Sequence, residues 1–198
     1  MRKVKTKTEI DKASLRRKII EQALILAAQE PWETVAPLEI AQACGVTYGE
    51  LCAVFPHKAD IVRAITTDLD RQTEEAGLVW DSDTSLRDRL FDVIMERFDL
   101  ATPHRAAHIS FLKAFGWVKN EICTDISQVR GSMKAMAALA GFDVGGRLGE
   151  LRLAGLCAVY GWVMLTWMND NTPDLSKTMA ALDQALGRAQ KLANYAGI

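Results

Sequence analysis

The sequence predicts an all-α protein of about nine helices, and three observations support this fold class. Apolar residues recur at intervals of three and four along most of the chain, which is the spacing of one face of an α-helix. No stretch alternates polar and apolar residues for more than a few positions, as a half-buried strand would. Glycine and proline residues separate the helical stretches and mark their ends.

Residues 1–75 are expected to hold four helices. The first starts after Asp11 or Ser14 and is closed by Pro31. Pro37 suits the first turn of the second helix, because the backbone N–H that a proline lacks has no partner there. The expected ranges of the second, third and fourth helices are 37–43, 48–54 and 58–75.

The turn between the second and third helices is short. Gly45 is free to adopt a positive φ, which a tight turn can require. Thr47 is suited to cap the third helix, because its hydroxyl accepts a hydrogen bond from a backbone N–H of the first turn. Two short helices joined in this way form a helix-turn-helix, the arrangement that sets a recognition helix into the major groove of DNA.

The remaining residues are expected to form five more helices. Thr84 or Ser85 caps the first of these, Pro103 separates it from the next, and Asp174 caps the last. The first of these helices is expected to run from just after Thr84 or Ser85 to residue 100. The expected ranges of the others are 104 to about 118, 127–140, 147–168, and 175 onward.

Charge is distributed unevenly along the chain. Residues 1–20 carry eight basic and two acidic side chains, a net charge of +6, and the rest of the chain carries a net charge of −7. A basic N-terminal segment on an acidic body indicates contact with a polyanion, although a merely solvated arm has the same composition. The most apolar run is Leu153–Met168, sixteen residues without a charge, which is shorter than the roughly 20 residues of a membrane span. Without a secretory signal either, we expect a soluble, cytoplasmic protein with no membrane partner.

Enzymatic and metal-binding motifs are absent from the sequence. The four cysteines form no CxxC pair, and there is no HExxH, GxGxxG, P-loop or nucleophile elbow. His104 and His108 lie four residues apart, as a two-ligand metal site would require, but a surface pair is the favoured interpretation. We therefore expect no enzyme, no metal and no cofactor.

The segment Leu38–Ile65 resembles the DNA-binding head of TetR-family transcriptional regulators. The matching residues, all in register, are Ile40, Ala41, Ala43, Gly45, Val46, Thr47, Gly49, Leu51, Phe55, Lys58 and Ile61. The resemblance implies an N-terminal arm and DNA-binding head in residues 1–75 and a helical effector-binding and dimerisation domain in residues 76–198. It further implies a ligand-responsive regulator, a repressor in function, that binds a palindromic DNA operator as a homodimer and responds to a small apolar effector.

The candidate recognition helix departs from the family pattern in its charge. Cys52 stands where the family carries a phosphate-binding tyrosine, and the only cation in residues 36–58 is Lys58, at the start of the fourth helix, where a phosphate could bind. Glu50 repels phosphate unless it accepts a hydrogen bond from a cytosine amino group. The candidate DNA-binding residues are Arg2, Lys3, Lys5, Lys7, Thr47, Tyr48, Glu50 and Lys58.

The second half supplies the other candidate sites that the family resemblance implies. The candidate residues for an apolar effector pocket are Met95, Phe98, His108, Phe111, Phe115, Trp117, Met136 and Trp162. Those for a dimer interface in the last two helices are Val159, Val163, Trp167, Met179, Leu182 and Leu186. In both cases an ordinary packed core of one subunit is the competing interpretation.

The C-terminal stretch Val159–Leu186 is also similar to ubiquinone-biosynthesis accessory proteins of TetR-like fold. The matching residues are Trp167, Asp170, Thr172, Pro173, Asp174, Thr178, Leu182 and Asp183. This similarity implies an alternative function, an isoprenoid-binding accessory protein that does not bind DNA. Those proteins use a further C-terminal amphipathic helix to touch membranes, which this sequence lacks after its last expected helix. The basic N-terminal segment favours the DNA-binding regulator.

Overall fold

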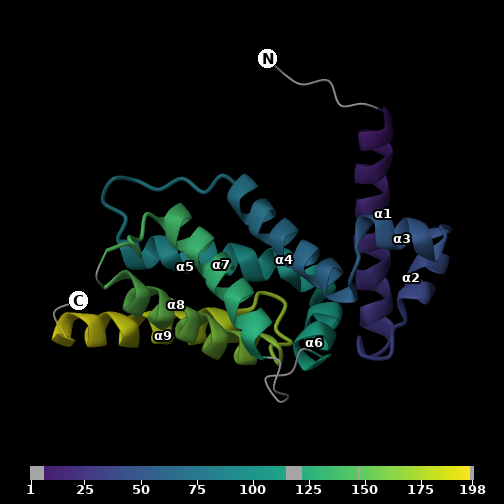
Figure 1. Ribbon diagram of the computed structural model, residues 1–198. Helices are drawn as coiled ribbons and strands as arrows, with labels where there is room; N and C mark the ends of the chain where they lie inside the picture. Colours follow the sequence, from purple (N-terminus) through teal and green to yellow (C-terminus); the bar gives the residue numbers. More distant parts are fainter. Residues whose placement is uncertain (1–6, 115–121, 147, 197–198) are drawn as a thin grey trace. The chain divides into compact units, whose positions relative to one another are not determined.

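The computed structural model describes residues 7–114, 122–146 and 148–196, and the regular elements in these ranges are all helical (Figure 1). This confirms the predicted fold class. The helices are α1 (Lys7–Gln29), α2 (Pro37–Cys44), α3 (Tyr48–Val54), α4 (Lys58–Glu75), α5 (Leu86–Ala101), the 3₁₀ turn η1 (Thr102–His104), α6 (Arg105–Ala114), α7 (Ile122–Ala140), α8 (Gly149–Trp167) and α9 (Ser176–Ala196).

Helix boundaries agree with the expected ones at α3 and α4 and differ at α1 and α7. Helix α1 begins at Lys7, several residues before the expected start, and α7 begins at Ile122 rather than Ser127. Neither added stretch contains a glycine or proline, so nothing in the local sequence stops the helix from extending toward the N-terminus.

The chain divides into two compact units. The first comprises residues 1–66 and 104–120, and the second comprises residues 67–103 and 121–198. The division falls within α4, and α6 belongs to the first unit. Each unit has its own buried apolar cluster.

The first unit is built around α1, which packs against α2, α3 and α6. Its core combines Ile19 and Ala23 of α1 with Ile40 of α2, Leu51 of α3 and Phe111 of α6, all buried. Only one side of the short helices α2 and α3 enters this core, so their other side faces solvent.

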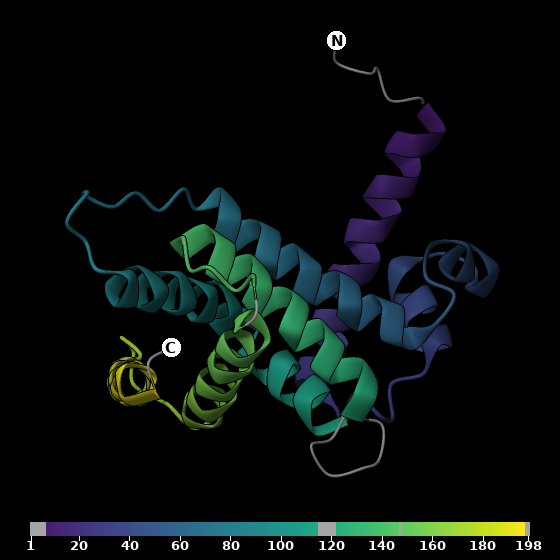
Figure 2. The same cartoon turned by 60° about the vertical axis from the view of Figure 1, so that its left-hand side comes forward.

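The second unit is a bundle in which α8 packs against α7 and α9, and α5 against α7 and α9 (Figure 2). Three aromatic rings lie at its centre: Phe98 stacks on Tyr160 with ring centroids 5.3 Å apart, and Trp167 lies 5.6 Å from Phe98. The end of α4 contributes Leu69 to the same core.

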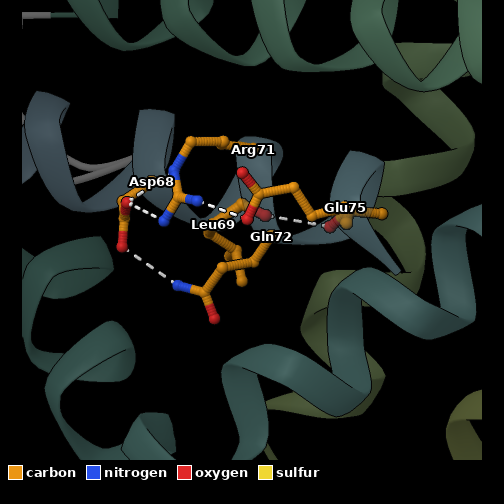
Figure 3. Close-up of polar contacts among 6 residues, drawn as sticks. Asp68, Leu69, Arg71, Gln72 and Glu75 are labelled. Carbon is orange, nitrogen blue, oxygen red and sulfur yellow. Dashed lines mark hydrogen bonds and ion pairs between the residues drawn. The ribbon is translucent and has the colours of Figure 1, made fainter. Parts of the chain in front are cut away.

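The solvent side of this part of α4 carries a chain of local polar contacts (Figure 3). Arg71 pairs with Asp68 at 2.7 Å and with Glu75, and Gln72 donates to Asp68 at 3.0 Å. Exposed pairs at this spacing support a helix only weakly. Measured over the described residues, every helix falls short of the length and apolar character that a bilayer crossing needs.

Candidate nucleic-acid interface

The turn between α2 and α3 has the geometry that the sequence predicts. Gly45 has φ 65° and ψ 32°, a left-handed conformation that costs glycine little and other residues more. Its N–H donates to the carbonyl of Gln42 at 2.9 Å, and the N–H of Val46 donates to that of Ala41 at 3.0 Å. These bonds end α2 and turn the chain toward α3.

Thr47 and Glu50 cap α3 reciprocally. The backbone N–H of Glu50 donates to Thr47 Oγ1 at 3.2 Å, and the backbone N–H of Thr47 donates to Glu50 Oε2 at 2.8 Å. Hydrogen bonds from the Thr47 backbone and hydroxyl lower the pKa of Glu50 below its usual value. The carboxylate is therefore held at the start of its own helix.

Helix α3 presents one side to solvent. Leu51 is 2% exposed and anchors the helix in the core, whereas Tyr48 is 51% exposed, and Gly49 and Ala53 are exposed as well. The outward side thus combines one aromatic side chain with two residues small enough to allow close approach of a partner.

Lys58 has a partner within the protein. Its Nζ donates to the backbone carbonyl of Trp32 and lies 4.4 Å from the centroid of the Trp32 ring. Burial lowers the pKa of Lys58, and the nearby Glu39, Glu30 and Glu33 oppose that shift. The ammonium group that the sequence predicts to hold a phosphate is bonded, in this structure, to the turn before α2.

Cations near α3 come from α1. Arg16 places its guanidinium 5.3 Å from the ring centroid of Phe55, the residue that follows α3. Lys12, Arg17 and Lys18 are exposed on the same helix. Arg16 belongs to the basic segment of residues 1–20 but is not among the candidate DNA-binding residues predicted from the sequence. Its position beside α3 depends on how α1 packs against α3, which neighbouring residues in the sequence do not reveal. Arg2, Lys3 and Lys5 and the side chain of Lys7 lie outside the described residues.

The candidate pocket residues that the structure describes are divided between the two units. Met95, Phe98 and Met136 are buried together in the core of the second unit. His108 and Phe111 belong to the first unit, and Phe111 is buried there against Trp32. Trp162 is 60% exposed on α8, and Phe115 and Trp117 lie outside the described residues. Helical periodicity cannot separate these residues, because it does not show which core a helix joins.

The expected dimer interface needs a similar correction. Of its six candidate residues, Val159, Val163, Trp167, Leu182 and Leu186 are buried and Met179 is partly buried, all in the core of a single subunit. The exposed side of α8 carries other residues: Leu151, Ala154, Gly155, Ala158, Trp162 and Leu165. Both sides of α8 are apolar, so sequence alone could not tell the inward one from the outward one.

A buried polar cluster in the second unit was not predicted. The Arg97 side chain, only 6% exposed, donates from Nε to Asp70 Oδ1 at 2.9 Å and from Nη1 to Tyr160 Oη. Ser132 donates to the other oxygen of Asp70 at 2.6 Å. The sequence contained one indication of this burial, because Arg97 follows Leu90 and Ile94 at helical spacing along the apolar side of α5.

The C-terminal stretch that resembles the accessory proteins forms a capped turn. Asp170 is fully buried and accepts hydrogen bonds from the backbone and hydroxyl of Thr172 and of Thr178, at 2.5 to 3.0 Å. Burial alone would raise the pKa of Asp170, but these four bonds hold it well below its usual value. Thr178 lies in the first turn of α9, so the shared pattern has a structural role here in capping that helix.

The histidine pair lacks further ligands among the described residues. His104 is exposed in η1, and His108 is half-buried with its ring 6.2 Å from that of Phe111. Within the described ranges, no group of three or more histidine, cysteine or carboxylate side chains is placed to hold a metal ion.

Comparison with known proteins gives matches at the level of structure. No protein-family model matches the sequence, and no curated protein does. Among solved structures, a TetR transcriptional regulator from Nitrosomonas europaea superposes with a TM-score of 0.73 at 21% identity, covering 89% of this chain and 98% of that one. A TetR transcriptional regulator from Rhodococcus sp. RHA1 gives 0.66 at 20% identity, with coverages of 89% and 96%. A TetR-family transcriptional regulator from Streptomyces coelicolor gives 0.63 at 18% identity, with coverages of 92% and 83%. The resemblance inferred from Leu38–Ile65 therefore extends over most of the chain, which has the fold of the TetR-family transcriptional regulators.

Proposed function

We propose that the protein is a cytoplasmic, ligand-responsive transcriptional regulator of the TetR type, a repressor that binds a palindromic operator as a homodimer. The observation that carries this proposal is the outward presentation of α3, which is capped by Thr47, anchored by Leu51 and led in by the left-handed Gly45. A short helix held in this way is what a helix-turn-helix offers to a major groove. The three solved structures of similar fold compared above are described as TetR transcriptional regulators.

The proposed DNA contacts divide between two helices. Tyr48 and the small residues around it on α3 face the bases or the groove wall. Phosphate contacts come from the basic side of α1, with Arg16 beside the end of α3, and from the basic segment before it. Glu50 repels the DNA phosphates less than its charge suggests, because its carboxylate accepts a hydrogen bond from the backbone N–H of Thr47 at the start of its own helix.

The test measures retardation of a duplex from the region upstream of the protein's own gene over a range of salt concentrations. Each phosphate contact contributes about one unit to the slope of log affinity against log salt concentration. Arg16→Gln should lower that slope by about one. Arg188→Gln, an exposed arginine of α9, is the control and should leave it unchanged.

Absence of retardation even at low salt would contradict the proposal and favour the alternative, an isoprenoid-binding accessory protein. One observation supports that alternative: α3 carries no cation, and Lys58 is engaged with Trp32. Native mass spectrometry of freshly purified protein separates the two, because the alternative requires a co-purifying isoprenoid.

A second copy of the chain is the proposed partner of the exposed side of α8. Gly155 and Ala158 allow two helices to approach closely, and Trp162 and Leu165 offer large side chains for burial. Two-fold symmetry would present two α3 helices to one face of DNA, as half-sites about 34–36 Å apart require.

Sedimentation equilibrium tests this interface. The unmodified protein should be a dimer at micromolar concentration, and Trp162→Lys should weaken association at least about ten-fold by placing a charge in the contact. Val79→Lys, at an apolar residue between α4 and α5 that is even more exposed than Trp162, should leave the dimer unchanged. A stable monomer before any substitution would remove this part of the proposal.

The proposed effector is a small apolar molecule bound by the second unit. Met95, Phe98 and Met136 line its core, and methionine side chains adapt readily to ligands of irregular shape. Addition of the effector should release the operator duplex without separating the two subunits.

A further inference from the structure

The side of α3 that faces solvent is nearly bare of side chains at its centre. Successive residues of an α-helix are about 100° apart around its axis, so Gly49 and Ala53 lie almost opposite the buried Leu51. Both are exposed. The centre of the outward side therefore carries a single methyl group, that of Ala53, and the exposed Tyr48 lies along its edge.

Gly49 leaves open space at this surface. Apart from its chain neighbours and the backbone of its own helix, a Cβ atom at this position would meet no described atom closer than Thr47 Oγ1, at 4.0 Å. The backbone here is helical, a conformation in which glycine is less favourable than alanine. Packing within the protein therefore gives no reason for a glycine, whereas close approach of an external partner does.

The polar side chains around this centre are already engaged. Thr47 Oγ1 accepts from the backbone N–H of Glu50 at 3.2 Å and donates to Glu50 Oε2 at 2.8 Å. That oxygen also accepts from the backbone N–H of Thr47, so the carboxylate reaches back to the start of the helix. The hydroxyl of Tyr48 is hydrogen-bonded to the thiol of Cys52, one turn along the helix.

The side chains that read purines are missing from α3. Arginine and lysine pair with guanine through two hydrogen bonds, and asparagine and glutamine pair with adenine in the same way. The sequence of α3, Tyr48–Val54, contains none of these four residues. The cations nearest to it lie on α1, where they are placed for phosphates, and phosphate contacts position a protein on DNA without selecting a base.

We propose that α3 selects thymine in the major groove, through contact of the Ala53 methyl group and the Tyr48 ring with the 5-methyl group of the base. Thymine alone among the four bases presents a methyl group in that groove, and apolar side chains recognise it by contact. The open space at Gly49 lets the helix come close enough for this contact. The inference rests on the proposed DNA binding and names the base that the operator supplies opposite α3.

The first test compares two forms of the duplex from the region upstream of the protein's own gene, with thymine or with deoxyuridine at every thymine position. Deoxyuridine keeps the hydrogen-bonding groups of thymine and lacks only the methyl group. The full chain should bind the deoxyuridine duplex more weakly, by about four-fold for each contacted methyl group. A third duplex, in which 7-deazaguanine replaces guanine and removes the N7 acceptor, should be bound as tightly as the thymine duplex.

A substitution at Ala53 separates direct contact from a change in DNA stiffness. The quantity compared is the ratio of the affinities for the thymine and deoxyuridine duplexes within one variant, in which any loss of folded protein cancels. Ala53→Gly should lower this ratio at least about two-fold, because the methyl contact is removed. Ala180→Gly, at an exposed alanine of α9, is the matched control and should leave the ratio unchanged.

A substitution at Gly49 tests the close approach. Gly49→Ala should weaken binding of both duplexes about ten-fold, because the added methyl group crowds the contact with DNA. Its thermal stability should not fall, because the protein leaves space for the methyl group and alanine favours the helix. Gly131→Ala, at an exposed glycine of α7 that also has open space around it, is the matched control and should leave DNA binding unchanged.

The outcomes distinguish this inference from the proposed function. Absence of retardation with every duplex would contradict DNA binding itself. Retardation with equal affinities for the thymine and deoxyuridine duplexes would overturn the inference and leave DNA binding in place. The same holds for a loss of affinity with 7-deazaguanine, for a ratio that Ala53→Gly does not change, and for unchanged binding in Gly49→Ala.

Discussion

The helix-turn-helix segment and the core of the second unit satisfy their polar groups in opposite ways. In the first, partners lie three residues apart: Thr47 with Glu50, and the backbone N–H of Ala36 with the Glu39 carboxylate at 2.7 Å. In the second, Arg97 joins residues 27 and 63 positions away, Asp70 and Tyr160. Local pairs form as soon as the helix forms and leave its outer side free for a partner. Distant pairs form only when the whole unit is assembled.

The distant pairs are also the more costly to disturb. Burial of an ion pair removes both charges from water, and the cost is offset only where the remaining donors and acceptors are also satisfied. Here Ser132 occupies the second oxygen of Asp70, and Tyr160 both accepts from Arg97 and stacks on Phe98. Burial raises the pKa of Tyr160, so its phenol stays protonated at neutral pH. We therefore expect substitutions in this cluster to have larger effects than those in the helix-turn-helix.

Arg97→Met should have the largest effect, a loss of about 3–5 kcal/mol in the free energy of unfolding, because Asp70 loses its partner in a largely buried position. Urea denaturation measures it. Arg71→Met removes an exposed arginine whose pairs are local and should change stability little. A loss below about 1 kcal/mol for Arg97→Met would remove the contrast between the two regions. The double substitution Arg97→Met with Asp70→Asn should recover part of the lost stability, because it also removes the unpaired charge of Asp70.

Asp170→Asn should cost about 2 kcal/mol at neutral pH. Each carboxylate oxygen of Asp170 accepts two hydrogen bonds, and an amide keeps only one oxygen, so two of the four bonds lose their acceptor and the other two become weaker. The folded-state pKa of Asp170 is lowered, so its contribution is complete above the unfolded-state pKa of about 3.9 and is lost as the pH falls below it. The stability difference between the two proteins should therefore narrow below about pH 4. Asp83→Asn, an exposed aspartate, serves as control. A difference that does not vary with pH would contradict this role.

Thr47→Ala should lower the free energy of unfolding by about 1 kcal/mol through loss of the α3 cap. Thr47→Ser keeps the hydroxyl and should retain most of the stability. Thermal unfolding gives the size of the effect, and amide hydrogen exchange should locate it in α3. Equal losses for alanine and serine would show that the methyl group, and not the cap, is responsible.

Lys58→Met should have the smallest effect, about 0.5–1 kcal/mol, because it retains the aliphatic stem and loses only the contacts with the Trp32 carbonyl and ring. The salt dependence of DNA binding should stay the same. If instead the slope of log DNA affinity against log salt concentration falls by about one while stability is unchanged, Lys58 contacts phosphate as the sequence predicts.

The sequence by itself determined the features that depend on neighbours along the chain. The bounds of α3 and α4, the left-handed Gly45 and the Thr47 cap were all predicted, because capping and turn preferences act over three or four residues. The start of α1 was not, since several residues before Asp11 can equally well begin a helix. The all-helical fold class followed from periodicity over the whole chain.

Tertiary structure decided which side of each helix is buried and which distant residues meet. Val159 and Trp162 are both apolar residues of α8, yet one lies in the core and the other in solvent. Arg16 meets Phe55, Lys58 meets Trp32, and Arg97 meets Asp70 only after helices far apart in sequence have packed. Apolar spacing gives the period of a helix but not its rotation about its own axis, and that rotation is set by the neighbours against which the helix packs.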